Sequence, residues 1–145
     1  MTASASSGAV RTNSFLDAFY EVRDEIQSWI SPKNYSLQRT IQTIREGAYH
    51  RNHTAHIQDD SILVWNDKIL KLSAPVYDPI AFIYYLRSQD LSIGESFHFL
   101  SAGEKKITKV SVHISGEERI KVTAGTFNCL KIDPVSPDGR PLLKN

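Results

Sequence analysis

One apolar stretch, over residues 77–87, has the spacing of a helix. Its apolar residues recur at i, i+3 and i+4 and cover nearly the whole circumference, which is typical of a helix surrounded by other elements. Asp78 is a favourable N-cap residue, and Pro79 suits the first helical position, where its missing N–H costs nothing. Arg87 would lie in the last turn, where its charge complements the helix dipole. The pattern predicts one short central helix over about residues 78–88.

Most of the chain on both sides of this helix alternates between apolar and polar residues, as β-strands with one buried face do. Hairpin turns are indicated at Glu46-Gly47 and Asn66-Asp67. The predicted fold is mainly β: a curved antiparallel sheet, or an incompletely closed β-barrel, wrapped around the helix. The expected strands begin near Tyr35 and then cover 49–57, 61–65, 68–72, 96–100, 105–114, 118–123 and 126–133, with turns at Ala102-Gly103, Ser115-Gly116 and Ala124-Gly125.

The segment over residues 14–30 fits both a helix and a strand. Its apolar residues suit one helical stripe, yet many of them also alternate with their neighbours as in a strand. We favour a strand that ends near Val22, followed by a helical turn over residues 23–29. Ser31 and Pro32 would end that turn, because the residue before a proline avoids the helical conformation.

The length of 145 residues and the hydrophobic fraction of 41% suit a single domain with its own core. We expect residues 1–12 to be a flexible lead-in or a frayed first strand, and residues 134–145 to be a loop or a disordered tail. The formal charge of +1, with both signs interspersed, argues against binding of nucleic acid. No apolar run is long enough to span a bilayer, and the N-terminus lacks the features of a signal peptide.

Three histidines, His50, His53 and His56, form the strongest metal-like pattern. On a strand that rises about 3.3 Å per residue, His50 and His56 would share a face roughly 20 Å apart, with His53 on the other face. We therefore favour a solvated strand face over a metal site, and expect no cofactor. Cys129 is the single cysteine, which excludes an internal disulfide, and we interpret it as a small core residue. No phosphate loop, nucleophile elbow or paired carboxylates appear, so no enzymatic activity is expected.

Arg87 and the aromatic residues have two interpretations each. Arg87 could hold a ligand carboxylate or phosphate, with Asp78 at the other end of the helix, but pairing with a strand carboxylate such as Glu118 is favoured because buried charges are normally paired. The aromatic residues could line an apolar pocket, although core packing explains their spacing better. These aromatic residues are Trp29, Trp65, Tyr84, Tyr85, Phe97 and Phe99. The candidate ligand-binding residues are Trp65, Ile83, Tyr84 and Arg87, and the candidate structural residues are Asp78, Pro79, Glu118 and Gly125.

The stretch Asp78-Pro79-Ile80-Ala81-Phe82-Ile83-Tyr84-Tyr85-Leu86-Arg87 resembles part of the bacterial family known as domain of unknown function 3108. The resemblance spans about Ser14 to Pro134. Members of that family usually have a signal peptide and further strands at both ends, so the chain resembles a partial domain or a diverged short relative. The other matching pieces, in the same order, are Tyr20-Glu21-Val22-Arg23-Asp24, Ser28, Arg45-Glu46-Gly47, Gly94, Glu118-Arg119-Ile120, Ala124-Gly125-Thr126-Phe127 and Pro134.

The resemblance implies a periplasmic or outer-envelope protein, similar in outline to periplasmic lipoprotein carriers, with no established enzymatic activity. Two function hypotheses follow. The first is a non-enzymatic envelope domain that binds a lipid or another apolar ligand between sheet and helix. The alternative is a structural or protein-interaction domain that uses its sheet edges and concave face. If strands are missing at the ends, pairing of edges between copies would give a homodimer.

Overall fold

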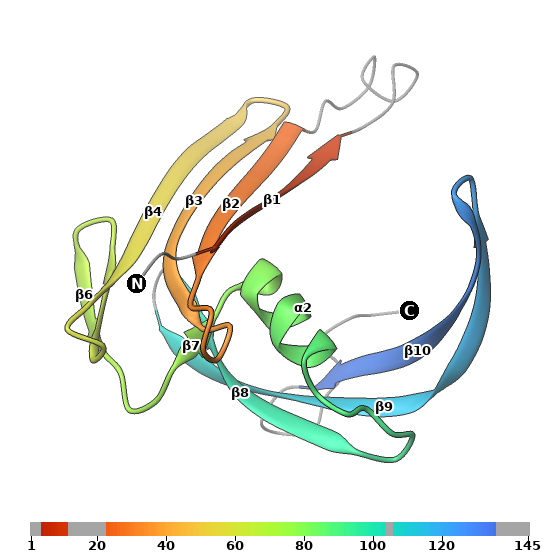
Figure 1. Ribbon diagram of the computed structural model, residues 1–145. Helices are drawn as coiled ribbons and strands as arrows, with labels where there is room; N and C mark the ends of the chain where they lie inside the picture. The colour runs from red at the N-terminus through yellow and green to blue at the C-terminus, as the bar shows by residue number, and fades with distance from the viewer. Residues whose placement is uncertain (1–3, 12–22, 104–105, 136–145) are drawn as a thin grey trace.

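The structure, a computed structural model, describes residues 4–11, 23–103 and 106–135 of the 145-residue chain. Within these ranges the chain forms two curved β-sheets and one short helix that lies inside their curve (Figure 1). This arrangement confirms the mainly β fold around a short helix. The elements are β1 (Ser4–Arg11), β2 (Arg23–Ile30), β3 (Leu37–Glu46), β4 (Tyr49–Gln58), β5 (Ile62–Trp65), β6 (Lys68–Lys71), β7 (Val76–Tyr77), α2 (Pro79–Arg87), β8 (Ser96–Ala102), β9 (Ile107–Val122) and β10 (Gly125–Val135).

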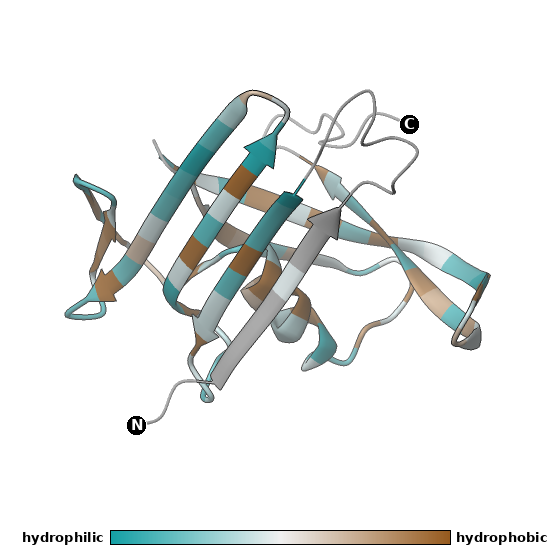
Figure 2. Cartoon of the chain, turned by 90° about the horizontal axis from the view of Figure 1, so that it is seen from above, coloured by the Kyte–Doolittle hydropathy of each residue, from teal (hydrophilic) through white to brown (hydrophobic). Residues whose placement is uncertain are grey.

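The first sheet is an antiparallel meander in which β1 to β6 lie side by side in chain order. Hydrophobic residues are interspersed with hydrophilic ones along β2 and β3, whereas β4 is hydrophilic over most of its length (Figure 2). Gly47 and Asn66 have φ values of 55° and 50° in the β3–β4 and β5–β6 turns. Tight hairpin turns favour positive φ, which glycine and asparagine tolerate, and both predicted hairpins are therefore confirmed.

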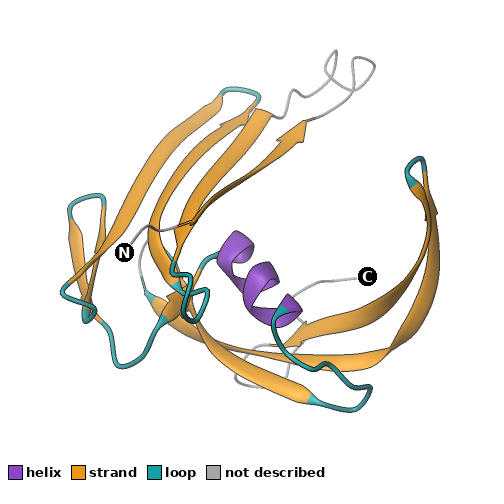
Figure 3. Cartoon of the chain, viewed as in Figure 1, coloured by secondary structure: helices purple, strands orange, loops and turns teal. Residues whose placement is uncertain are grey.

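The second sheet has the order β10-β9-β8-β7. Its strands β8, β9 and β10 are antiparallel, whereas β7 is only two residues long and pairs in parallel with Leu100 and Ser101 of β8. A parallel pair requires a crossover connection, and α2 supplies it (Figure 3). Strand β7, α2 and β8 thus form a short βαβ unit. Among the described strands, none of the first sheet pairs with one of the second, so the barrel is not closed.

The expectation of a helical turn over residues 23–29 is wrong, because these residues belong to strand β2. Strand β2 pairs with β1 on one side and with β3 on the other. Its residues Ser28 and Ile30 point to the buried side, and two neighbouring strands outweigh the local helical stripe. Residues 1–12 are expected from the sequence to form either a flexible lead-in or a frayed first strand, and Ser4–Arg11 form strand β1. The strand expected up to Val22 lies outside the described residues.

The turn expected at Ser115-Gly116 is also wrong, since β9 runs without interruption for 16 residues. Across from it, Lys131 pairs with Gly116 and Ile132 pairs with Ile114, which leaves Ser115 as an extra residue. Such a β-bulge bends and twists a strand without ending it. The long β9–β10 ribbon curves accordingly (Figure 1).

Strand β10 extends beyond the predicted end at Asp133 to Val135, and its Pro134 lies opposite Val112. Proline lacks an N–H to donate, and an edge strand tolerates it because only one of its sides pairs. The remainder of the expected tail, residues 136–145, lies outside the described residues.

Two clusters of buried residues lie in the core of the described chain. The first lies among β3 to β8 and contains Leu37, Ala55, Leu63, Trp65, Val76 and Ala102. The second lies at α2 and contains Ile30, Tyr77 and Ala81, with Tyr35, Phe82, Tyr85 and Phe99 packed against it.

Helix α2 is not surrounded on all sides. Ala81 and Leu86 are buried, but Ile83 and Tyr84 keep 52% and 40% of their surface exposed. The expectation that the helix is buried all round, with Tyr84 in the core, is therefore wrong. The helix packs against β1, β2 and β7, and through Phe82 against Phe99 of β8, and these elements cover only part of its circumference. No helix within the described ranges is long and apolar enough to cross a membrane.

Candidate functional site

The N-terminus of α2 is held by Asp78, which is almost fully buried. The Asp78 carboxylate accepts a hydrogen bond of 2.8 Å from the backbone N–H of Ala81, as an N-cap residue does. It accepts a second hydrogen bond from the hydroxyl of Ser28 on β2. A side chain at Gly8 on β1 would meet Ile80 of the helix at 3.1 Å. These contacts fix the position of α2 relative to the first sheet.

Four aromatic side chains form a cluster between α2 and the second sheet, hereafter the aromatic cluster: Tyr77, Phe82, Tyr85 and Phe99. The ring centroids of Tyr77 and Tyr85 lie 4.9 Å apart, and the ring of Phe82 stacks on that of Phe99 at 3.8 Å. Tyr77 meets Phe99 edge-on at 6.2 Å. Tilted and edge-on contacts, such as those of Tyr77 with Tyr85 and Phe99, stabilise aromatic pairs beyond the burial of their area.

Next to the aromatic cluster lies a pocket of about 580 Å³, hereafter the aromatic pocket. It lies beside the part of β8 that precedes the pairing with β7, because β7 begins at Val76 opposite Leu100 and the chain before it, Ala74 and Pro75, borders the pocket. Seven of its ten lining residues are apolar or aromatic, which suits an apolar ligand. The lining residues are Ala74, Pro75, Tyr77, Tyr85, His98, Phe99, Leu100, Lys109, Val110 and Ser111.

The polar residues of the aromatic pocket come from one face of β8 and β9. His98 lies opposite Ser111, and Lys109 lies opposite Leu100. The Nδ1 atom of His98 is 2.7 Å from the hydroxyl oxygen of Ser111. A serine–histidine pair is the start of a nucleophile–base arrangement, but a working site also needs a group that orients the histidine and donors for an oxyanion. No carboxylate lines this pocket among the described residues.

Tyr77 forms a neutral wall of the aromatic pocket. Its hydroxyl donates a hydrogen bond of 3.2 Å to the backbone carbonyl of Asn34. Burial, and to a lesser degree the nearby phenol of Tyr85, raise the pKa of Tyr77 above its ordinary value. The phenol is therefore uncharged at neutral pH, which keeps this side of the pocket compatible with an apolar ligand.

A second pocket of about 430 Å³ lies on the other side of the chain segment that leads into β7. Pro75 borders both pockets. Half of the twelve lining residues of the second pocket are polar or charged, and Lys33 and Asp60 contribute opposite charges. The second pocket is thus less suited to an apolar ligand than the aromatic pocket. Its lining residues are Ser31, Pro32, Lys33, Asn34, Ser36, Leu37, Gln38, Ile57, Asp60, Leu72, Pro75 and Val76.

The four candidate ligand-binding residues are not brought together by the fold. Trp65 is buried in the first core cluster, with 3% of its surface exposed. Ile83, Tyr84 and Arg87 are exposed on α2. Neither the aromatic pocket nor the second pocket is lined by any of the four.

The candidate structural residues have different outcomes. Asp78 is the N-cap of α2 and Pro79 its first residue. Gly125 has a φ of 141°, which side chains rarely allow, at the start of β10. Glu118 and Arg87 are both exposed, and no ion pair joins them in the part of the chain that the structure describes. The expected buried pair is therefore absent.

The three histidines on β4 do not all lie in solvent. His50 and His56 are exposed, but His53 is buried with its ring 6.1 Å from that of Trp65. Its Nδ1 atom is 3.3 Å from the side-chain amide nitrogen of Asn66. As predicted for a strand, His53 points to the other face from His50 and His56, and this side of β4 faces the core. Among the described residues, no three His, Cys, Asp or Glu side chains are grouped to hold a metal ion.

Some pocket residues were foreseeable from sequence and others were not. The aromatic candidates Tyr85 and Phe99 line the aromatic pocket, whereas Trp29 lies elsewhere, with the guanidinium of Arg39 5.1 Å from its ring centre. Tyr77 and Lys109 were missed. The pairing of Leu100 with Lys109 places the lysine there, and only the register of β8 with β9 reveals it. Cys129 is only half-buried, on strand β10.

The sequence of this chain matches the model of one known protein family. The family model described as Protein of unknown function (DUF3108) matches residues 5–145, which is nearly the whole chain. The chain belongs to this family. The match extends beyond the stretch from Ser14 to Pro134 over which the resemblance was seen. Among curated proteins and among solved structures, no match is found.

Proposed function

We propose that this DUF3108 chain is a non-enzymatic domain of the cell envelope that binds an apolar small molecule, such as a lipid. The observation that carries the proposal is the aromatic pocket of about 580 Å³, in which seven of ten lining residues are apolar or aromatic. Pockets of this size and composition are typical of small-molecule sites. The location in the envelope rests on the family resemblance alone, and fractionation of cells that produce the natural protein tests it.

The binding proposal is tested by filling the aromatic pocket. Ala74 lines the pocket and is exposed, so tryptophan at this position fills space without disturbing the core. We expect Ala74→Trp to abolish binding of the neutral fluorescent probe N-phenylnaphthylamine, which brightens in apolar surroundings. Ala48→Trp, in the exposed β3–β4 turn, is the matched control and should bind the probe as the natural chain does. Equal binding by the two variants would contradict the proposal.

Native mass spectrometry tests for a ligand that accompanies the protein through purification. We expect extra mass the size of a lipid, which disappears on denaturation and is reduced in the Ala74→Trp variant. Extra mass that stays unchanged in that variant would place the ligand outside the aromatic pocket. The same spectrum gives the number of subunits.

A specific observation also favours a second candidate function, that of a protein-interaction domain. Ile120 and Phe127 lie opposite each other on the β9–β10 ribbon and keep 40% and 50% of their surface exposed. Val122, two residues further along β9, is 50% exposed. Strand β10 forms one edge of its sheet within the described chain. Exposed apolar residues beside a free edge are suited to contact with another protein, including a second copy of the chain.

Sedimentation velocity tests this second function. If the ribbon mediates a homodimer, Phe127→Lys should give monomers at concentrations where the natural chain is dimeric. Ile69→Lys is the control, because Ile69 is 70% exposed on the other sheet. A natural chain that is monomeric throughout would leave only a different protein as partner, and a dimer unchanged by Phe127→Lys would exclude the ribbon from the interface.

A further inference from the structure

We infer that the ligand of the aromatic pocket is an amphiphile with an anionic headgroup, a carboxylate or a phosphate, beside its apolar tail. This inference rests on the proposed function, since it concerns the ligand of the same pocket. It adds the chemical class of the headgroup and the residues that recognise it. The tail would lie against the aromatic cluster, and the headgroup against His98 and Lys109.

Among the described residues, the aromatic pocket is lined by two basic side chains and by no acidic one. His98 and Lys109 both line it, and neither aspartate nor glutamate is among its lining residues. Because His98 lies opposite Ser111 and Lys109 opposite Leu100, the two basic side chains share one face of neighbouring strands. Diagonal neighbours on one face of an antiparallel pair lie within reach of long side chains. One small anionic group can therefore contact both.

The hydrogen bond between His98 and Ser111 orients the histidine ring. The Nδ1 atom lies 2.7 Å from the Ser111 hydroxyl oxygen. When the Ser111 hydroxyl donates to Nδ1, the Nε2 atom carries the ring proton and can donate it to a ligand oxygen. Lys109 is exposed, so its ammonium group can move to meet a headgroup. A lysine ammonium binds phosphate as a point charge with three donors. The arrangement thus provides a fixed donor and an adaptable one.

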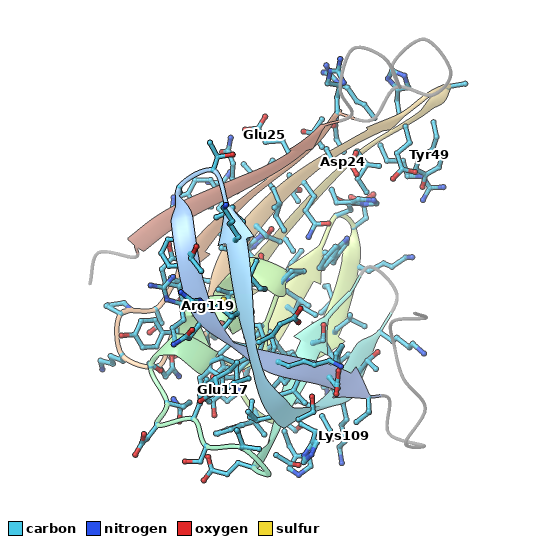
Figure 4. All side chains as sticks on the ribbon, turned by 90° about the vertical axis from the view of Figure 1, so that its right-hand side faces the viewer. Asp24, Glu25, Tyr49, Lys109, Glu117 and Arg119 are labelled. Atoms are coloured by element: carbon cyan, nitrogen blue, oxygen red, sulfur yellow. The ribbon has the colours of Figure 1, made fainter. Side chains whose placement is uncertain are left out.

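The next residues along the same face of β8 and β9 are again a serine and a histidine. Ser96 lies opposite His113, and its hydroxyl oxygen is 3.2 Å from the Nδ1 atom of His113. A second Ser–His pair therefore follows the first along β8 and β9. Figure 4 shows Lys109 at the opposite end of the molecule from the acidic residues Asp24 and Glu25.

The apolar side of the aromatic pocket lies on the other face of β8. Phe99 and Val110 form a cross-strand pair there, and Phe99 contacts Tyr77 and Phe82. Residues 98 and 99 point to opposite faces, so the pocket passes from a basic face to an aromatic one around the part of β8 that β7 leaves unpaired. A molecule with one charged end and one apolar end fits this change of surface. The second pocket contains Lys33 and Asp60 and lacks such a contrast.

The test uses three ligands with the same apolar tail and different headgroups: dodecanoate, dodecanol and dodecyltrimethylammonium. Each displaces bound N-phenylnaphthylamine from the full chain at low salt. We expect dodecanoate to displace the probe at about a fivefold lower concentration than dodecanol, which is the size expected for one exposed ion pair, and the cationic ligand to be the weakest. Equal displacement by all three would overturn the headgroup inference and leave the proposed function standing. Failure of the chain to bind the probe or any of the three ligands would instead overturn the proposed function.

Variants assign the headgroup contact to named residues. Lys109→Gln should weaken dodecanoate by about fivefold and leave dodecanol unchanged, and Lys109→Arg should restore the difference. His98→Gln should act in the same direction as Lys109→Gln. The control is Lys121→Gln, an exposed lysine of β9 outside the pocket, which should change neither ligand. Loss of dodecanoate preference in the control, or its retention in Lys109→Gln, would overturn the assignment.

A last comparison separates a lipid headgroup from a free anion. Dodecyl phosphate should displace the probe, whereas inorganic phosphate at the same concentration should not, because its binding lacks the contribution of the tail. If inorganic phosphate alone displaces the probe, the site recognises a free anion and the amphiphile is excluded.

Discussion

The hydroxyl of Ser28 donates a hydrogen bond to the carboxylate of Asp78, which joins β2 to the N-cap of α2 across 50 residues of sequence. Both residues are almost fully buried. The carboxylate also accepts the backbone N–H of Ala81. One side chain therefore caps the helix and attaches it to the first sheet.

Asp78→Ala removes both of these hydrogen bonds. Loss of an N-cap costs about 0.5 to 2 kcal/mol, and a buried hydroxyl left without its partner adds about 1 to 3 kcal/mol. We expect the free energy of unfolding to fall by roughly 2 to 4 kcal/mol in urea denaturation. Asp90→Ala, at an exposed position after the helix, should change it by less than about 0.5 kcal/mol. Equal effects of the two substitutions would show that Asp78 does not attach the helix.

Thr40→Val should not lower the stability of the protein, unlike most substitutions of a buried polar residue. Thr40 is fully buried, and its hydroxyl has no hydrogen-bond partner in the described part of the chain. Valine has nearly the same shape without the unsatisfied group, so we expect a neutral result or a stabilisation of about 1 kcal/mol by thermal denaturation. Ser28→Ala, on the adjacent strand, should destabilise. A clear loss of stability in Thr40→Val would reveal a buried water bound to the hydroxyl.

The two sides of α2 predict different costs for truncation. Leu86 is 4% exposed and Tyr84 is 40% exposed. We expect Leu86→Ala to lower the free energy of unfolding by about 2 to 5 kcal/mol, and Tyr84→Ala by about 1 kcal/mol. Urea denaturation of both variants measures the difference. A larger cost at Tyr84 would mean that another part of the chain covers this face.

The raised pKa of Tyr77 makes stability depend on alkaline pH. Burial, followed by the effect of Tyr85, raises the folded-state pKa above the unfolded-state value near 10. The contribution of the neutral phenol is therefore fully present below about pH 10 and is lost as the pH rises through the folded-state value. We expect stability to decline above about pH 10, and to decline less steeply in Tyr77→Phe than in the control Tyr49→Phe. Chemical denaturation across this pH range, together with tyrosinate absorbance, provides the measurement.

Sequence patterns predicted the elements whose signals are local. Asp78 and Pro79 mark the start of the helix because capping depends on a few adjacent residues. Asn66-Asp67 marks a hairpin because the positive φ values of a tight turn depend on the residue types in the turn itself. The Ser115-Gly116 pair carries the same kind of turn signal, yet pairing with β10 converts it into a bulge. A local signal cannot show that outcome, because the partner strand supplies the competing hydrogen bonds.

The site was less predictable than the fold, because it depends on strand register. Periodicity shows that Ile83 and Tyr84 are apolar positions on a helix, but not which side of the helix the sheets leave open. In the same way, Lys109 has the pattern of an ordinary solvated lysine, and only its position opposite Leu100 places it at the aromatic pocket. The register of neighbouring strands therefore decides which residues meet.

Each described strand pairs only with its neighbours along the chain, and this has a consequence for the order of folding. Contacts between adjacent strands close short loops, which costs little chain entropy. The hydrogen bond from Ser28 to Asp78 closes a loop of 50 residues, so we expect it to form late. Stopped-flow kinetics of Asp78→Ala should then show faster unfolding with a nearly unchanged folding rate, the behaviour of a contact absent from the transition state. The bond that attaches the helix would thus govern how long the folded state lasts more than how quickly it forms.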